Sequence, residues 1–575
     1  MNSLLNVLDV SFSRGSLLLF ENISFSIGTG DRLGFVGHNG SGKSSLLSLL
    51  AGKEEPDTGE IRMPRGQRVA LVEQFVPGEL AQMTLIDAVL DVIPAEQRPV
   101  TRHQADELLD QLGFAHDQTL LPLGSTSGGQ QNLALLARAI ILQPELLLMD
   151  EPGNHMDVMA LAYLQRYLLS NQSIPFLMIS HDRELLNACC NRTIFLRDKT
   201  LFSFDQSFDQ AAKALAERDV QAAQARQAEE KEIRRLQTSA KRLAQWGKNY
   251  DNEDLARKAK TMQKRVERLK EEQTAISHGS GLELHLNTES LRARSVVTLE
   301  NLVIVTPDGE RTLLEIEFQH IRPGDRIALL GRNGVGKSTT INRLVAAIGQ
   351  QDDFVRFNPN VNLGYYDQEL EEFSSARGRF DWLRDRSDMT DEPIKQVLLK
   401  NGIPFTDFDH SVDKLSGGER ARLMFMLFQL NKPNFLILDE PTNHIDIQGR
   451  EQLEQQLIES DATLLITSHD RRFIEQVANR WWWINNEQLI ELNGLDEFYA
   501  AVQQDASKEQ SQTKPTQQTQ TTAMPQTMSE DDKLARIDEL EKLLREDKAR
   551  KTKFQKLQRQ QAWEKELAEL WKDME

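Results

Sequence analysis

The chain carries the octet GHNGSGKS at residues 37–44 and a second octet of the same form, GRNGVGKS, at residues 331–338. Both fit the phosphate-binding pattern G-x-x-x-x-G-K-[ST]. Each octet follows a short apolar run and precedes a segment of helical character, which is the context that the pattern requires. The sequence therefore predicts two nucleotide-binding loops, each at a turn from a strand to a helix.

The glycines of such a loop let backbone N–H groups point inward at a phosphate, and the following helix adds its positive N-terminal end. We expect Lys43 and Lys337 to reach the β- and γ-phosphate oxygens, and Ser44 and Ser338 to ligate Mg²⁺. The predicted phosphate-binding residues are Gly37, Asn39, Gly40, Gly42, Lys43 and Ser44 in the first loop, and Gly331, Asn333, Gly334, Gly336, Lys337 and Ser338 in the second.

Two acidic pairs lie downstream of the loops, Asp150-Glu151 and Asp439-Glu440, each at the end of an aliphatic run. A buried strand that ends at Asp150 or Asp439 would set a carboxylate beside Mg²⁺. The next residue, Glu151 or Glu440, would then be free to polarise the attacking water. This combination predicts a nucleotide hydrolase.

Two further motifs occur once in each half. A Ser-Gly-Gly turn at a helix start offers N–H groups and a hydroxyl to an anion. The residues of these turns are Ser127, Gly128 and Gly129 in the first half, and Ser416, Gly417 and Gly418 in the second. His181 and His469 each follow an aliphatic run within a Ser-His-Asp triplet. We expect these histidines at strand ends, where an imidazole would touch the γ-phosphate.

The spacing of equivalent residues indicates a tandem duplication. Lys43 recurs as Lys337 after 294 residues, and Glu151 recurs as Glu440 after 289. A repeat of this length is a whole domain. Because each copy mixes short aliphatic runs with helical segments, we predict the α/β class, with a mostly parallel sheet in each domain.

A charged, helical stretch joins the two copies, and Gly and Asn residues interrupt it near residues 246–252. This pattern predicts two antiparallel helices with a short tip. A Gln/Thr-rich tract near the end predicts a disordered linker, and the last residues predict a helical coiled-coil segment. The predicted parts are a first domain (1–210), a basic helical linker (211–290), a second domain (291–502), a disordered linker (503–528) and a C-terminal helical segment (529–575).

Net charge and composition limit the classes to which this protein can belong. The chain has a formal charge of −19, but residues 231–270 hold thirteen Lys or Arg against five Asp or Glu, which makes this window +8. Such a window fits either an RNA-binding element or a solvated helix face with i,i+4 ion pairs. No apolar stretch approaches the roughly 20 residues that span a bilayer, and we expect no secretion signal. With two adjacent cysteines, Cys189 and Cys190, we expect a cytoplasmic protein.

Over residues 1–502, the motifs and their order resemble ATP-binding-cassette (ABC) ATPases. This resemblance implies ATP and Mg²⁺ as ligands, and it implies that Gln74 and Gln368 sense Mg²⁺ and water. It also implies a head-to-tail pairing of the two domains within one monomer. One site would then join residues 37–44 to residues 416–419, and the other would join residues 331–338 to residues 127–130.

The strings EPGNHMD (151–157) and EPTNHID (440–446), together with the basic linker, resemble the ABC-F group. This resemblance implies a translation factor that enters the tRNA exit site of the ribosome and contacts rRNA and tRNA through residues 231–270. Ribosome protection or rescue is part of that expectation. Two alternatives remain: a DNA-associated ATPase, in which the C-terminal segment binds DNA or RNA, and the energising subunit of an ABC transporter.

Several positions depart from the family pattern. Arg14 and Thr306 stand where the family has an aromatic residue against adenine. Thr126 replaces the usual Leu before the first Ser-Gly-Gly turn, and Gly153 replaces the usual Thr of the heptapeptide. The departures at Thr126 and Gly153 predict two unequal sites, and those at Arg14 and Thr306 leave the nucleobase preference open.

Overall fold

The computed structural model describes residues 3–154, 156–249, 253–271, 286, 288–306, 308–368, 373, 376–443 and 445–502. The predicted disordered linker and the predicted C-terminal coiled-coil segment lie outside these residues.

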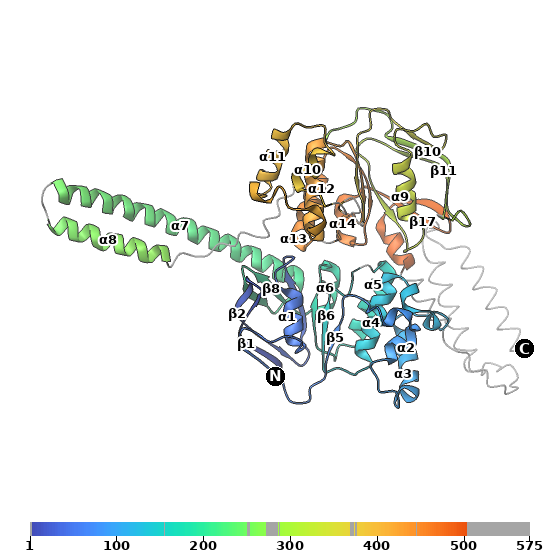
Figure 1. Ribbon diagram of the computed structural model, residues 1–575, viewed down its shortest axis with the longest axis horizontal. Coiled ribbons are helices and arrows are strands. Elements are labelled where there is room, and N and C mark those ends of the chain that lie inside the picture. Colours follow the sequence, from blue (N-terminus) through green and yellow to red (C-terminus); the bar gives the residue numbers. More distant parts are fainter. Residues whose placement is uncertain are drawn as a thin grey trace, which may run out of the picture. The chain divides into compact units, whose positions relative to one another are not determined.

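The first domain is built on a six-stranded sheet with the order β5-β6-β7-β3-β8-β9 (Figure 1). Its strands are β3 (Arg32–Gly37), β5 (Val69–Val72), β6 (Leu146–Asp150), β7 (Phe176–Ile179), β8 (Arg192–Arg197) and β9 (Thr200–Phe204). All neighbouring strands are parallel except β9, which pairs antiparallel with β8 at the edge. A separate antiparallel sheet contains β1 (Ser3–Arg14), β2 (Leu17–Gly28) and β4 (Thr58–Arg62).

Both faces of the central strands are covered, which explains their continuous aliphatic sequences. Along β6, Leu146 and Leu148 pack with β1, β2 and the helix after the first loop. Leu147 and Met149 point the other way, into the helices on the opposite face. The helices of this domain are α1 (Lys43–Leu50), α2 (Leu85–Leu90), α3 (Arg98–Gln111), α4 (Gly128–Ile140), α5 (Val158–Ser170) and α6 (Arg183–Cys189).

The second domain repeats this plan in one nine-stranded sheet with the order β13-β10-β11-β18-β17-β12-β16-β15-β14. Its strands are β10 (Val297–Val305), β11 (Thr312–Ile321), β12 (Arg326–Leu330), β13 (Val355–Phe357), β14 (Leu363–Tyr366), β15 (Phe435–Asp439), β16 (Thr463–Thr467), β17 (Arg480–Asn485) and β18 (Gln488–Leu492). Its helices are α9 (Lys337–Ala346), α10 (Arg379–Arg384), α11 (Asp391–Lys400), α12 (Gly417–Asn431), α13 (Ile447–Glu459) and α14 (Arg471–Val477). One apolar cluster contains residues of both domains, including Leu186 of the first and Ile447 and Ile474 of the second.

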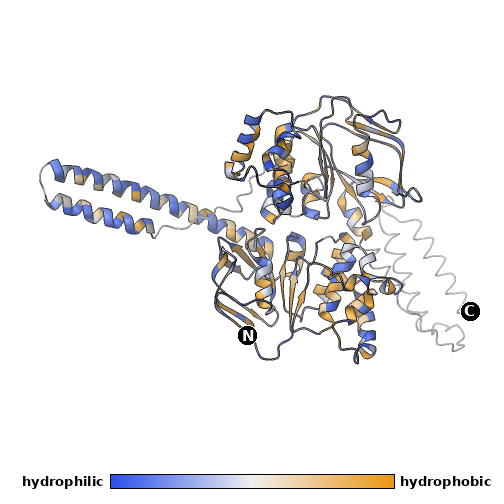
Figure 2. Ribbon diagram, viewed as in Figure 1, coloured by the Kyte–Doolittle hydropathy of each residue, from blue (hydrophilic) through white to orange (hydrophobic). Residues whose placement is uncertain are grey.

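The linker forms two helices side by side, α7 (Phe208–Asn249) and α8 (Glu253–Glu271), as Figure 1 shows. Helix α7 begins three residues before the predicted linker, because Phe208, Ala211 and Leu215 belong to the apolar core of the first domain. Farther along, buried Ile233 and Val266 lie on the facing sides of the two helices. Most other residues of this hairpin are hydrophilic, as the colours of α7 and α8 in Figure 2 show. Within the described residues, no helix combines the length and the apolar character needed to cross a bilayer.

Candidate active sites

Three neighbouring strands place the predicted residues of the first domain at one edge of its sheet. The phosphate loop follows β3, Asp150 ends β6, and His181 comes shortly after β7. The order β6-β7-β3 makes these strands adjacent, and they are parallel, so their carboxyl ends meet at the same edge. In the second domain β15, β16 and β12 have the same order and bring together Asp439, His469 and the second loop.

The phosphate loops require glycine at the residue before the helix. Gly42 has φ of +95°, and a Cβ there would lie 2.9 Å from Cβ of Leu19. Gly336 has φ of +103°, and a Cβ would lie 3.1 Å from Cβ of Leu313. A side chain at either position would meet both backbone strain and a close contact. Helices α1 and α9 then start with the loop lysines.

Both lysines fold back onto their own loops. Nζ of Lys43 donates to the carbonyl oxygens of Gly37 (2.8 Å) and His38 (3.0 Å). Nζ of Lys337 donates to those of Gly331 (2.8 Å) and Arg332 (3.1 Å). Burial lowers the pKa of both lysines, and nearby acidic groups oppose this shift, Glu151 first for Lys43 and Glu440 first for Lys337. The ammonium groups of Lys43 and Lys337 are therefore held against the carbonyl oxygens of their own phosphate loops.

The glutamates after β6 and β15 adopt a backbone conformation that is uncommon for a residue with a side chain. Glu151 has φ of 48° and Glu440 has φ of 50°. The N–H of Glu151 donates to Ile179 O at 2.9 Å, which ties this turn to the neighbouring strand. Such strained residues cluster at functional sites, where the surrounding structure holds them in place.

Each glutamate is paired with the histidine of its own domain. The N–H of His181 donates to Oε2 of Glu151 at 3.1 Å, and Nε2 of the ring lies 3.4 Å from Oε1. In the second domain the corresponding distances from His469 to Glu440 are 3.2 and 3.4 Å. Oε1 of both glutamates is buried and has no hydrogen-bond partner in the described part of the chain. Each pair thus leaves one carboxylate oxygen able to accept a hydrogen bond from a water molecule.

Burial controls the charge states of the first pair. It raises the pKa of Glu151 to about 7, against the opposing effect of Lys43. It lowers the pKa of His181 well below the usual value, and the positive charges of Lys43 and Arg450 act in the same direction. Nε2 of the neutral ring lies 3.1 Å from Oδ1 of Asn39 in the phosphate loop. The ring therefore connects the glutamate with the loop.

The carboxylates at the strand ends contact the loop serines. Asp150 forms a hydrogen bond with Ser44, and Asp439 forms one with Ser338. Burial raises the pKa of both carboxyls. A cation beside a carboxylate favours its ionised form, so both positions suit a bound metal ion.

Each phosphate loop faces a Ser-Gly-Gly turn of the other domain. The first site is a pocket of about 590 Å³ that contains Lys43. It is lined by Asn39, Gly40, Gly42, Lys43, Ser44, Gln74, Asp150, Glu151 and His181 of the first domain, and by Ser416, Gly417 and Gly418 of the second. The structure thus brings together the two sets of residues that the head-to-tail prediction joined.

The second site is a pocket of about 470 Å³ that contains Lys337. It is lined by Asn333, Gly334, Gly336, Lys337, Ser338, Gln368, Asp439, Glu440 and His469 of the second domain, and by Gly128, Glu151, Gly153, Asn154, Met156, Leu161, Ser180 and Asp182 of the first. Ser127 lines a neighbouring pocket with Asp157 and Asn333. Gly129 is not among the described residues that line either site.

The Ser-Gly-Gly serines are engaged with their own helices. Ser127 caps α4 through Gln130, and Ser416 caps α12 through Glu419. Gly37 and Gly331, at the starts of the loops, take part through the carbonyl oxygens that accept from the lysines.

The two residues that stand where the family has an aromatic residue against adenine lie differently relative to their sites. Arg14 lines the first site together with Leu17 and Leu19. Phe12, a neighbouring aromatic, is buried against Phe20 with ring centroids 6.0 Å apart. The hydroxyl of Thr306 donates to Asp308 within a turn, and Thr306 is not among the described residues that line the second site.

Sequence reasoning gave no role to three residues that connect the domains. Oδ2 of Asp446 lies 3.3 Å from Nδ1 of His38, and Oδ2 of Asp157 accepts from the N–H of Asn333 at 3.3 Å. These aspartates end the two repeated heptapeptides, so their equivalent positions in the sequence could have identified them as functional residues. Arg450 lines both sites. It has no such signal, because Leu161 occupies the matching position 289 residues earlier.

Comparison with known proteins identifies the family. The family model described as ABC transporter matches residues 20–154 and again residues 315–443. YdiF of Bacillus subtilis is 30% identical over 547 residues, which cover 86% of this chain and 82% of YdiF. ABC transporter F family member 2 of Arabidopsis thaliana is 27% identical, with coverage of 84% and 77%. The chain belongs to the ABC-F subfamily of ATP-binding-cassette ATPases.

The solved structure described as a model of ribosome-bound archaeal Pelota and ABCE1 is also similar. It has a TM-score of 0.57 and 19% identity, and the match covers 86% of this chain and 80% of that chain. At this identity the likeness concerns the fold. The predicted ABC-F family, the predicted α/β fold with two ABC domains, and the predicted ATPase activity are confirmed.

The two ATP sites of this ABC-F protein should contribute unequally to turnover. Ser416 lines the first site, whereas Ser127 lies outside the second. We therefore expect Glu151→Gln alone to lower steady-state ATP hydrolysis more than Glu440→Gln alone. Phosphate release from the two purified single variants at saturating ATP measures this. Equal losses would show that the second site is as competent as the first.

Proposed function

We propose that the protein hydrolyses ATP at two Mg²⁺-dependent sites with Glu151 and Glu440 as the general bases. Each glutamate would accept a proton from the attacking water through Oε1, which has no hydrogen-bond partner among the described residues, while the adjacent histidine holds the other carboxylate oxygen through its N–H. Lys43 and Lys337 would bind the β- and γ-phosphates. The facing Ser-Gly-Gly turn would complete each site with backbone N–H groups.

The proposed Mg²⁺ ligands are Ser44, Gln74 and Asp150 in the first site, and Ser338, Gln368 and Asp439 in the second. Within the described residues, no group of three or more His, Cys, Asp and Glu side chains could hold a metal by itself. One carboxylate, one hydroxyl and one amide leave positions for phosphate oxygens and water, which is the coordination typical of Mg²⁺ in ATPases. Bound there, Mg²⁺ would neutralise charge that develops on the phosphates.

We propose further that this ATPase binds the ribosome and modulates translation, including ribosome protection or rescue. The observation that carries the proposal is the surface of α7 and α8. All thirteen Lys and Arg residues of the window 231–270 are exposed there. They are Lys231, Arg234, Arg235, Lys241, Arg242, Lys248, Arg257, Lys258, Lys260, Lys264, Arg265, Arg268 and Lys270.

An RNA contact explains the excess positive charge of the hairpin better than a solvated helix surface with internal ion pairs does. Arg234 pairs with Glu230 at 3.7 Å, and Arg265 of α8 pairs with Glu232 of α7 at 3.4 Å. Thirteen cations against five anions exceed what such pairs neutralise. Trp246, near the end of α7, is 49% exposed and supplies an aromatic surface for a base to stack on. The proposed contact is with rRNA and tRNA at the tRNA exit site, as in the family that the motifs resemble.

Co-sedimentation tests this function. The Glu151→Gln/Glu440→Gln protein, saturated with ATP, is incubated in parallel with ribosomes, inverted membrane vesicles and duplex DNA. We expect ATP-dependent recovery with ribosomes. Recovery with membranes would favour a transporter subunit instead, and recovery with DNA would favour a DNA-associated ATPase.

A further inference from the structure

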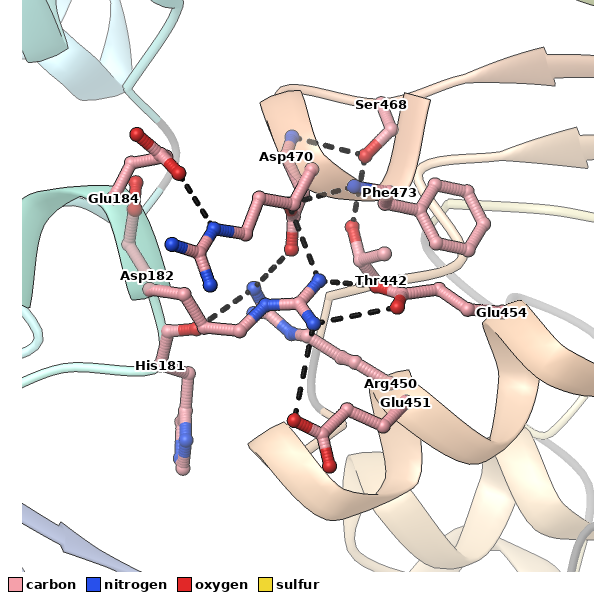
Figure 3. Close-up of polar contacts among 12 residues, drawn as sticks. His181, Asp182, Glu184, Thr442, Arg450, Glu451, Glu454, Ser468, Asp470 and Phe473 are labelled. Atoms are coloured by element: carbon pink, nitrogen blue, oxygen red, sulfur yellow. Dashed lines mark hydrogen bonds and ion pairs between the residues drawn. The ribbon is translucent and has the colours of Figure 1, made fainter. Parts of the chain in front are cut away.

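A buried arginine of the second domain holds the catalytic turn of the first. Arg450, on α13, is 8% exposed. Its Nη1 donates to the main-chain oxygen of His181 at 3.1 Å, across the domain interface. The N–H of the same His181 donates to Glu151. The histidine backbone is thus held from one side by the glutamate of its own site and from the other by the opposite domain. Figure 3 shows Arg450 beside His181 at this contact.

The guanidinium is itself fixed by the second domain. Nη1 also donates to Oδ2 of Asp470 at 3.1 Å, and Nε donates to the main-chain oxygen of Ile445 at 3.1 Å. Asp470 directly follows His469, the histidine of the second site, and it caps α14 through the N–H of Phe473. One guanidinium therefore joins the histidine turns of both sites.

A second arginine reinforces the same contact from the other direction. Arg183 of α6 forms an ion pair with Glu454 of α13, and its Nη2 lies 3.8 Å from Oδ1 of Asp470. Figure 3 shows Glu454 and Asp470 close to Arg450 at this contact. Because Arg183 and Arg450 share Asp470, a displacement of the Asp470 turn would move the donor that holds His181.

The repeat does not supply a second arginine at the position of Arg450. Leu161 occupies that position in the first domain, and its side chain has no hydrogen-bond donor. Leu161 instead packs beside Gly153, where an added Cβ would lie 3.1 Å from its Cδ2. The first domain reaches the histidine turn of the second through a different helix, by way of Arg183 of α6 and Asp470.

We propose that Arg450 is a positioning residue through which the second domain sets the rate of hydrolysis at the first site. Arg450 acts on His181 and, through it, on the orientation of Glu151. The proposal rests on the catalytic roles proposed above for Glu151 and His181.

Site-resolved trapping tests this role. The full-length protein hydrolyses a photoreactive ATP analogue in the presence of vanadate, which retains the product at a site that has turned over. Crosslinking, proteolysis and mass spectrometry then report the label in each domain. For Arg450→Leu we expect label at the first site to fall about tenfold, as for loss of a hydrogen bond from a charged donor, while label at the second site falls by a smaller factor.

A KM-against-kcat comparison separates positioning from binding. Both phosphate loops are untouched in Arg450→Leu, so KM for ATP should stay unchanged while kcat falls. Arg450→Lys keeps a cationic donor and should recover part of the lost label. Arg472→Gln is the matched control, because Arg472 crosses the same interface and forms its ion pairs with Glu184 and Asp209, away from the catalytic turn.

The outcomes are decisive for each idea separately. Equal loss of label at both sites would mean that Arg450 only stabilises the interface. An equal effect of Arg472→Gln would have the same meaning. Unchanged label at the first site would also overturn the proposal. Glu151→Gln is measured in the same assay. If that variant still traps nucleotide at the first site, the proposed catalytic role fails; if it does not, the result for Arg450 stands on its own.

Discussion

The double variant Glu151→Gln/Glu440→Gln is expected to bind ATP but to hydrolyse it about 10²–10⁴-fold more slowly than the wild type, the usual range for loss of a general base. The amide of glutamine keeps the size of the side chain and can still accept from the histidine N–H. It cannot take a proton from water. The loops with Lys43 and Lys337 remain intact, so affinity for ATP should be unchanged.

Two measurements check this result: phosphate release at saturating ATP, and equilibrium binding of a fluorescent ATP analogue. Glu145→Gln is a suitable control, because Glu145 lies just before β6 and is half exposed beside Arg68. That variant should hydrolyse ATP like the wild type. Wild-type turnover in the double variant would contradict the assignment of both glutamates.

Replacement of five cations on α8 by Gln is expected to weaken ribosome binding by about tenfold or more at moderate salt. The five are Arg257, Lys258, Lys260, Lys264 and Arg265, all exposed. Gln is a good helix former, and the exposed pair between Arg265 and Glu232 contributes little to stability. Fold and basal ATPase activity should therefore survive. Each lost phosphate contact should flatten the log-log salt dependence by about 0.7 to 0.9.

A salt series of ribosome co-sedimentation, with the ATP-bound double-glutamine protein as parent, measures this effect. The matched control removes the same charge from the first domain by replacing five exposed cations, Lys53, Arg62, Arg65, Arg68 and Arg102, with Gln. We expect the control to bind almost as the parent does. If the control and the α8 variant lose affinity equally, net charge and not the hairpin determines binding.

Local sequence was sufficient to predict most residues of each half-site. Lys43, Asp150 and His181 each follow or end an aliphatic run, and parallel strands bring their carboxyl ends to one edge of a sheet. Strand formation and the glycine-dependent turn depend on residues close together in the chain. The local pattern of residue types is therefore enough to predict both. The same reasoning extended to the hairpin, because the charge and helix propensity of residues 211–271 are local properties too.

Local sequence did not predict the individual contacts across the domain interface. The structure places Gly128 in the second site but leaves Ser127 in an adjacent pocket, although both belong to one turn. A sequence motif marks the turn as a unit. Which atom faces the opposite loop depends on how two domains pack, to within a few ångström.

The sequence by itself determined the duplicated α/β domains, the two phosphate loops with their carboxylates and histidines, and the basic helical linker, because each follows from periodicity and motifs within a short stretch of chain. Only the tertiary structure decided that Asp446 meets His38 and that Arg450 holds the oxygen of His181. Arg450 and His181 are 269 residues apart, and the duplication offers no hint, since Leu161 stands at the equivalent position. Their contact arises from the packing of one folded domain on the other, which no local pattern encodes.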